Sequence, residues 1–335
     1  MAKRSIELAR CLYQYTMTHC ERCEKICPQG AIAGHTIDTA KCDDCGLCTA
    51  VCPTGAIEAC VNYEDGLEQV MQEERQLLVC DKCRTSPFPC LGFLNRRLLW
   101  TLAQAGDVYL ALGACAGCKP AVCEWLQAEA AAANEALQQA AETGEVSTDG
   151  PAQQTAGRHP ATVHRIHFVR LQGDKQTVER PLLERGVSRR GIFSALFHAA
   201  QDKVVEVEQR NAAALGVTFD GAAWLARYHE GIPTEKIPRS LFPGLSVGRR
   251  CNACGLCASV CPEDALYCNW ATKEMRFRPL ACTSCGLCTA NCSQDALELL
   301  PTFDGQVEFH PGRPEDAPAR ELADTDATDM DEERE

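Results

Sequence analysis

The spacing of the cysteines constrains this chain more than any other feature. Fifteen of its 24 cysteines fall into four runs, with one pair of runs near each end. The two runs near the C-terminus share the spacing C-x2-C-x2-C-x3-C and consist of Cys251, Cys254, Cys257, Cys261, Cys282, Cys285, Cys288 and Cys292. Thiolates are soft ligands that select soft metals. The spacing therefore predicts that the chain wraps around metal centres at both ends.

The N-terminal pair of runs departs from this spacing at one position. Its second run is regular and consists of Cys42, Cys45, Cys48 and Cys52. Its first run has only Cys20, Cys23 and Cys27, because Met17 stands where the leading cysteine is expected.

Three of the runs contain the sequence C-x2-C-G-L-C, with glycines at 46, 255 and 286. A glycine at this position predicts a positive φ, which lets the backbone turn tightly around a metal centre. Each run is followed by a short apolar step, such as Ala31-Ile32, which predicts a short strand. Prolines follow the fourth cysteine in three runs, at 28, 53 and 262, and predict a short helix opening there.

On these residues the chain resembles two-cluster bacterial ferredoxins, over roughly residues 1–62 and 245–300. In that family each [4Fe–4S] cluster takes three cysteines from one run and the fourth from the other. The resemblance implies one cluster on Cys251, Cys254, Cys257 and Cys292, one on Cys282, Cys285, Cys288 and Cys261, and one on Cys42, Cys45, Cys48 and Cys27. Zinc sites are the alternative, but zinc favours two close pairs of cysteines over a three-plus-one run.

The remaining N-terminal cluster has Cys20, Cys23 and Cys52 as ligands and needs a fourth. We predict Cys11, which lies in a segment long enough to fold back. The alternatives are a [3Fe–4S] cluster, a thiolate from Cys60, a thioether from Met17, and Cys11 as an inert buried thiol. Cys60 and Cys268 each follow a fourth-position cysteine and are expected to be buried free thiols.

Six further cysteines lie between the two paired runs: Cys80, Cys83, Cys90, Cys115, Cys118 and Cys123. A strand at 76–80, a helix over 92–105 and a strand at 107–112 predict a right-handed parallel unit. The pairs Cys80/Cys83 and Cys115/Cys118 follow the two strands, so both should lie at one edge of the sheet. They predict a four-cysteine site for zinc or a fifth iron–sulfur cluster. The segment is similar to the small iron–sulfur subunits of hydrogenase and heterodisulfide reductase complexes.

The sequence therefore predicts an α+β fold with two ferredoxin-like two-cluster modules, 1–65 and 245–303, flanking a cysteine-rich α/β middle domain at 76–142. A linker region at 143–244 should contain a weak strand at 162–170 and a helix over 189–216. Residues 314–335 hold ten acids among 22 residues and are expected to be a disordered tail.

The net charge of −13 argues against nucleic acid and favours a partner with a basic patch. No secretory signal or membrane span is visible, which predicts a cytoplasmic protein. Motifs for nucleotide and for covalent haem are absent from the sequence. We therefore expect an iron–sulfur electron-transfer protein with four [4Fe–4S] clusters, acting as a non-catalytic subunit of a formate dehydrogenase, hydrogenase or molybdenum/tungsten oxidoreductase. The alternatives are a free-standing polyferredoxin and a redox enzyme that uses the middle cysteines.

Overall fold

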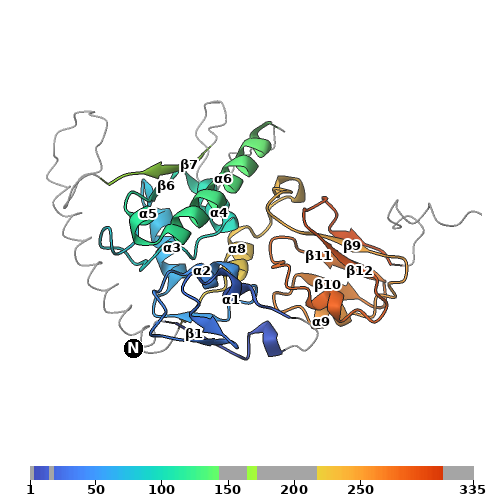
Figure 1. Cartoon of the computed structure of the whole chain (residues 1–335). Helices are drawn as coiled ribbons and strands as arrows, with labels where there is room; N and C mark the ends of the chain where they lie inside the picture. Colours follow the sequence, from blue (N-terminus) through green and yellow to red (C-terminus); the bar gives the residue numbers. More distant parts are fainter. Residues whose placement is uncertain (1–3, 15–18, 143–163, 172–216, 312–335) are drawn as a thin grey trace, which may run out of the picture.

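The computed structural model describes residues 4–14, 19–142, 164–171 and 217–311 (Figure 1). The predictions about Met17, the linker at 143–160, the helix over 189–216 and the acidic tail at 314–335 lie outside these residues. None of the helices within the described ranges is both long enough and apolar enough to cross a membrane.

The N-terminal part is built from short elements around the first two runs. They are β1 Arg4–Ile6, the 3-10 helix Leu12–Gln14, α1 Arg22–Ile26, β2 Ile32–Ala33, β3 Thr36–Ile37, α2 Leu47–Val51 and β4 Ile57–Ala59. β2 and β3 form an antiparallel hairpin, and β4 pairs antiparallel with β1 on one side. On its other side β4 pairs with β8, Val217–Thr218, which comes from far along the chain.

The C-terminal part repeats this plan around the last two runs. It contains β9 Gly244–Val247, α9 Leu256–Ser259, β10 Leu266–Asn269, β11 Glu274–Phe277, α10 Leu287–Ala290, β12 Leu297–Leu300 and β13 Glu308–Phe309. β10, β11 and β13 form one antiparallel sheet, and β12 pairs with β9. The predicted strands after the four runs are thus present as β2, β4, β10 and β12.

The prediction that a short helix opens at each fourth cysteine is wrong. The short helices α1, α2, α9 and α10 instead lie before that cysteine. Cys27 and Cys52 cap the ends of α1 and α2 in an extended conformation. The proline that follows each of them cannot continue a helix, so it marks the end of the element rather than its start.

The middle part is a three-stranded parallel sheet with helices packed against it. Its elements are β5 Gln76–Leu78, α4 Arg96–Ala105, β6 Val108–Ala111, α5 Cys115–Cys118, α6 Pro120–Glu142 and β7 Ile166–Val169. β5 and β6 pair in parallel, as the strand–helix–strand pattern predicts. The weak strand expected at 162–170 becomes β7 and extends the same sheet in parallel with β6.

The helix α4 begins later than predicted because Asn95 caps it. The Asn95 side chain accepts hydrogen bonds from the backbone N–H groups of Arg97 and Leu98. An N-cap of this kind fixes the start of a helix. Phe93 and Leu94 therefore precede the helix, although both are buried.

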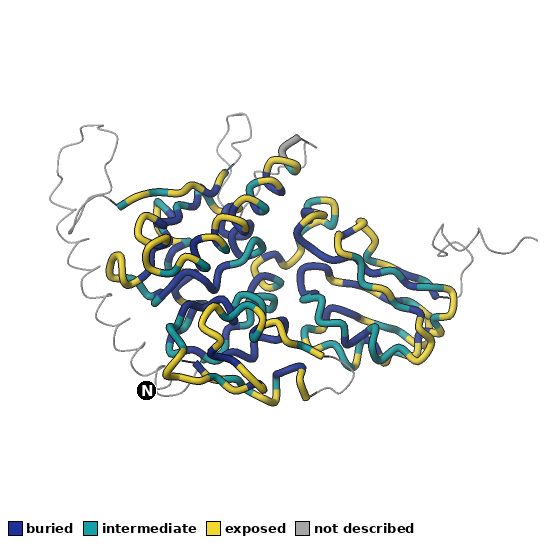
Figure 2. The backbone as a smooth tube through the Cα atoms, viewed as in Figure 1, coloured by how far each residue is buried: buried dark blue, intermediate teal, exposed yellow. Residues whose placement is uncertain are grey.

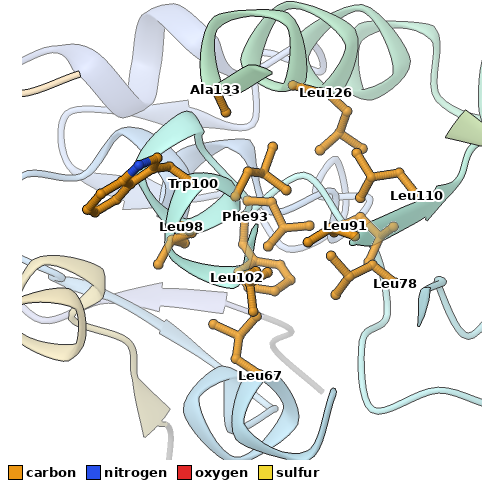
Figure 3. Packing of buried hydrophobic residues seen from close by; sticks show 14 of the residues in the cluster. Leu67, Leu78, Leu91, Phe93, Leu98, Trp100, Leu102, Leu110, Leu126 and Ala133 are labelled. Atoms are coloured by element: carbon orange, nitrogen blue, oxygen red, sulfur yellow. The ribbon is translucent and has the colours of Figure 1, made fainter. Parts of the chain in front are cut away.

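The main hydrophobic core lies around α4 and joins the middle part to its neighbours. Figure 3 shows Leu98 and Leu102 of α4 among side chains from α6, β5 and β6. Leu67 reaches the same core from α3, Tyr63–Gln72, and α8, Gly221–Tyr228, packs on it through buried Trp224. Figure 2 shows that buried backbone runs through this region and along the C-terminal strands, with exposed loops outside. A 3-10 helix, Thr234–Lys236, leads from α8 towards β9.

Candidate iron–sulfur sites and a middle cavity

The cysteine loops share one backbone conformation. Gly46, Gly255 and Gly286 have φ of 87°, 82° and 85° and cap the helices that carry the third cysteine. The residue two positions earlier also has positive φ in all three loops, at Asp44, Ala253 and Ser284. Alternation of right- and left-handed residues turns several backbone N–H groups to one side, which forms a concavity that binds anions, including iron–sulfur centres. The positive φ predicted at these glycines is confirmed.

The C-terminal cysteines gather into two groups of four, which we call the first C-terminal site (Cys251, Cys254, Cys257 and Cys292) and the second C-terminal site (Cys261, Cys282, Cys285 and Cys288). Burial, followed by the neighbouring thiols of its own site, raises the pKa of Cys288 to about 12. In the first site, burial raises the pKa of Cys251, and the neighbouring thiol of Cys292 raises it further. The structure therefore places each fourth cysteine beside the three cysteines of the other run.

The same exchange occurs near the N-terminus. The second N-terminal site (Cys27, Cys42, Cys45 and Cys48) places Cys27 and Cys42 beside Cys48. The first N-terminal site contains Cys20, Cys23 and Cys52, with Cys11 beside them. Burial raises the pKa of Cys11, and the charges of Cys52 and Cys20 raise it further.

Cys11 therefore lies next to the three cysteines of this site, and its role as the fourth ligand stays a prediction. It is 8% exposed, and its Sγ lies 3.9 Å from Nδ1 of His35. Burial also raises the pKa of Cys23 to about 12, with contributions from Cys52, Cys20 and Cys11. Thiols that hold their protons this tightly lose them when a metal binds, because a coordinating thiol is deprotonated outright.

The fourth cysteine of each run accepts a backbone hydrogen bond from the residue four positions later. The donors are the N–H groups of Ala31, Ala56, Ala265 and Ala296, at 3.2–3.4 Å from the sulfurs of Cys27, Cys52, Cys261 and Cys292. A hydrogen bond to a ligating sulfur is one of the ways in which a protein sets the reduction potential of an iron–sulfur cluster. The donor set and these N–H groups therefore fit iron–sulfur clusters in all four sites.

One arginine lies against the second site of each part, the buried Arg4 near the N-terminus and the half-buried Arg97 near the C-terminus. Arg4 is 2% exposed and pairs with Asp44 at 2.6 Å. Burial opposes its charge, but Tyr63, Asp44 and Cys48 outweigh that effect and raise the pKa of Arg4. Arg97 donates hydrogen bonds to the backbone oxygens of Leu241 (2.8 Å) and Cys282 (2.7 Å). Burial lowers its pKa to about 10, so Arg97 remains charged at neutral pH.

Arg22 joins the N-terminal and C-terminal parts. It stands next to Cys23 in α1 and donates hydrogen bonds to the backbone oxygens of Thr283 and Ser284, at 3.4 and 2.7 Å. Both acceptors lie between Cys282 and Cys285 of the second C-terminal site. The first N-terminal site and the second C-terminal site therefore face each other across this contact.

A cavity of about 470 Å³, which we call the middle cavity, lies between the middle part and the second N-terminal site. Its lining includes Cys80, Cys83, Cys90, Cys115, Cys118, Lys82, Lys119, Asp43 and Asp44. The predicted set of Cys80, Cys83, Cys115 and Cys118 is thus on one cavity. Cys90, to which the sequence pattern assigned no role, lines the same cavity.

No group of three or more His, Cys, Asp or Glu side chains in the described ranges converges closely enough to hold a single metal ion. A four-iron cluster is a larger body than one ion, and its thiolates stand around it.

Comparison with known families supports iron–sulfur binding at both ends. The family model for a 4Fe-4S binding domain matches residues 35–58, and that for a 4Fe-4S dicluster domain matches residues 250–296. No curated protein and no solved structure matches the chain. The chain thus carries ferredoxin-type 4Fe-4S domains near its N-terminus and near its C-terminus, and these domains support an iron–sulfur electron-transfer role.

Proposed function

We propose that this chain relays electrons through four [4Fe–4S] clusters, two near each end, as a subunit of a larger redox complex. The observation that carries the proposal is the exchange of the fourth cysteine between runs, which occurs in both parts. A bound [4Fe–4S] cluster takes up and releases one electron.

The surrounding residues support this role through charge and spacing. Arg4 and Arg97 place a positive charge beside the second site of each part, which favours the more negative, reduced state. The contact of Arg22 with residues 283 and 284 holds the two parts together where their sites face each other. The resulting order runs from the first C-terminal site through the second C-terminal and first N-terminal sites to the second N-terminal site.

Metal and sulfide analysis of anaerobically purified protein tests the number of clusters. Four sites require about 16 irons and about 16 sulfides. A content near eight of each would leave one end of the chain without its two clusters and would overturn the relay.

The proposed partner is an oxidoreductase subunit with a basic docking surface, because the chain carries a net charge of −13. Isolation from cells under low salt should bring a catalytic subunit with it, and high salt should release that subunit. A chain that elutes alone and reduces several unrelated acceptors would favour a free-standing polyferredoxin. Turnover of a small substrate by the isolated chain would favour a redox enzyme.

A further inference from the structure

The middle cavity is lined by five thiols, those of Cys80, Cys83, Cys90, Cys115 and Cys118. Cys80 and Cys83 have their sulfurs 3.5 Å apart. Burial, followed by Cys90, Cys80, Cys123 and Cys83, raises the pKa of Cys115 to about 12. Cys80, Cys83, Cys90 and Cys115 line the cavity and form one interacting set, drawn from the ends of β5 and β6 and from the loop before α4. Cys123 also acts on Cys115 but does not line the cavity.

Cys118 stands apart from this set. Its Sγ lies 3.2 Å from Nζ of Lys82, and both side chains are on the exposed side of the cavity. After burial, Cys90 and Cys80 contribute most to the raised pKa of Cys115, whereas Cys118 contributes to the raised pKa of Cys83, where it ranks ahead of Cys90. Cys90, by contrast, is 4% exposed and lies at the back of the cavity.

The cavity also adjoins the second N-terminal site. Lys119 donates a hydrogen bond to the backbone oxygen of Asp43 at 2.6 Å. Burial raises the pKa of both Cys45 and Cys90, and the charge of Lys119 opposes that rise in both. A Cβ added to Gly92 would come within 2.3 Å of the backbone oxygen of Cys45. The two cysteine loops therefore touch, with one lysine between their thiols.

We propose that Cys80, Cys83, Cys90 and Cys115 hold a fifth iron–sulfur cluster in the middle cavity, and that Cys118 is a thiol at its mouth rather than a ligand. Four cysteine ligands suit both [2Fe–2S] and [4Fe–4S] clusters. Such a centre carries excess negative charge, and Lys82 and Lys119 offset it from two sides. The proposal deepens the proposed function, because it adds a redox centre to the end of the relay.

The position assigns this centre a role in exchange with a partner. When one electron passes from the second N-terminal site to the middle centre, the first is oxidised by one electron and the second is reduced by one electron. The exposed Cys83 and Cys118 mark the open side of the cavity, where a redox protein could deliver or remove that electron.

The test compares the full chain with single variants, each reconstituted anaerobically with iron and sulfide. We expect about two or four irons beyond the 16 of the four other sites. Cys90→Ala should lose this surplus and one reducible spectroscopic signal, while Cys118→Ala and Cys123→Ala should keep both. The proposed ligand set would be overturned if Cys118→Ala or Cys123→Ala lost the surplus iron and Cys90→Ala kept it.

Two further results keep the test decisive. The four other sites report on folding, because a misfolded variant would lose their iron as well. If Cys90→Ala does so, Cys83→Ala replaces it, since Cys83 is exposed and its removal leaves the core untouched. A wild-type chain that holds zinc or no metal in the middle cavity, with 16 irons elsewhere, would overturn the fifth cluster and leave the four-cluster relay standing.

Discussion

Cys11 lies beside the one site for which the sequence spacing supplies only three cysteines. The position of the missing ligand falls on Met17, outside the described residues, whereas Cys11 is buried beside Cys20, Cys23 and Cys52. The segment before the first run folds back because β1 pairs with β4, which follows Cys52. A local element thus brings a thiol to a site defined by distant residues.

Cys11→Ser should damage only the first N-terminal site. The variant should lose about four irons, or retain a three-iron cluster with its characteristic paramagnetic signal, because three thiolates remain. Iron analysis and electron paramagnetic resonance of the oxidised and reduced protein measure this. Cys60→Ser is the matched control and should behave like the unmodified chain. The reverse result would make Cys60 the ligand.

Arg97 is the second residue whose role can be measured directly. Its half-buried guanidinium donates hydrogen bonds to two backbone carbonyl oxygens, one of them that of Cys282. Arg97→Met removes a positive charge that favours the reduced state, so the potential of the second C-terminal site should fall. The expected shift is on the order of tens of mV, since about 1 kcal/mol corresponds to roughly 40 mV for one electron. Redox titration measures it.

Arg97→Lys keeps the charge and should restore most of the potential. A potential that is unchanged in Arg97→Met would mean that this charge is too well screened to act on the site.

At the level of elements, sequence patterns predicted most of the short strands and the parallel pairing of β5 with β6, but they misplaced the short helices and missed several tertiary contacts. The strands after each run and the positive φ of Gly46 follow from short-range spacing, and both are present. The pairing of β8 with β4 could not be predicted, because a two-residue strand has no pattern of its own. The place of Cys90 in the middle cavity depends on how the loop before α4 packs against the loop of residues 42–48, which is also a tertiary contact.

The glycines of the cysteine loops differ in what surrounds them, which gives a prediction at this scale. An alanine in the left-handed region costs about 1–2 kcal/mol wherever it stands. Nothing lies within 4 Å of a Cβ added to Gly255, whereas a Cβ on Gly46 would meet the backbone nitrogen of Phe93 at 2.9 Å. Gly46→Ala should therefore destabilise the protein more than Gly255→Ala.

The two variants are compared by their free energy of unfolding in denaturant and by the rate at which each releases iron to a chelator. Equal effects would show that the loop of residues 42–48 can move away from the middle part without cost.

At the scale of the whole molecule, the parts are held by side chains that reach from one cysteine loop to another. Arg22 links the N-terminal and C-terminal parts, Arg97 links the middle and C-terminal parts, and Lys119 links the middle and N-terminal parts. Each of these contacts ends on a backbone oxygen within a loop that carries ligands. The hydrogen bonds that hold the three parts together therefore also fix the positions of the sites relative to one another.

Arg22→Ala should leave all the clusters bound but loosen the junction between the two ends. Arg22 is exposed to solvent, so we expect a loss of at most about 1 kcal/mol of stability from this contact. Electron transfer between the parts, followed after rapid photoreduction, should become slower. Lys25→Ala is the matched control, because Lys25 lies on the same helix and forms an ion pair with Glu21 rather than a contact with the C-terminal part. Equal rates in both variants would exclude Arg22 as the link.

The position of β8 has a consequence for biosynthesis. The sheet of the N-terminal part is complete only when Val217 and Thr218 have joined β4, and the following Phe219 packs on Tyr63 and Phe93. A ribosome releases the first seven cysteines of the paired runs long before it reaches these residues. During that interval the nascent thiols lack part of their protein covering and are open to oxygen and to stray metals. The cell's cluster-assembly machinery must therefore either shield this stretch during translation or wait for the end of the chain.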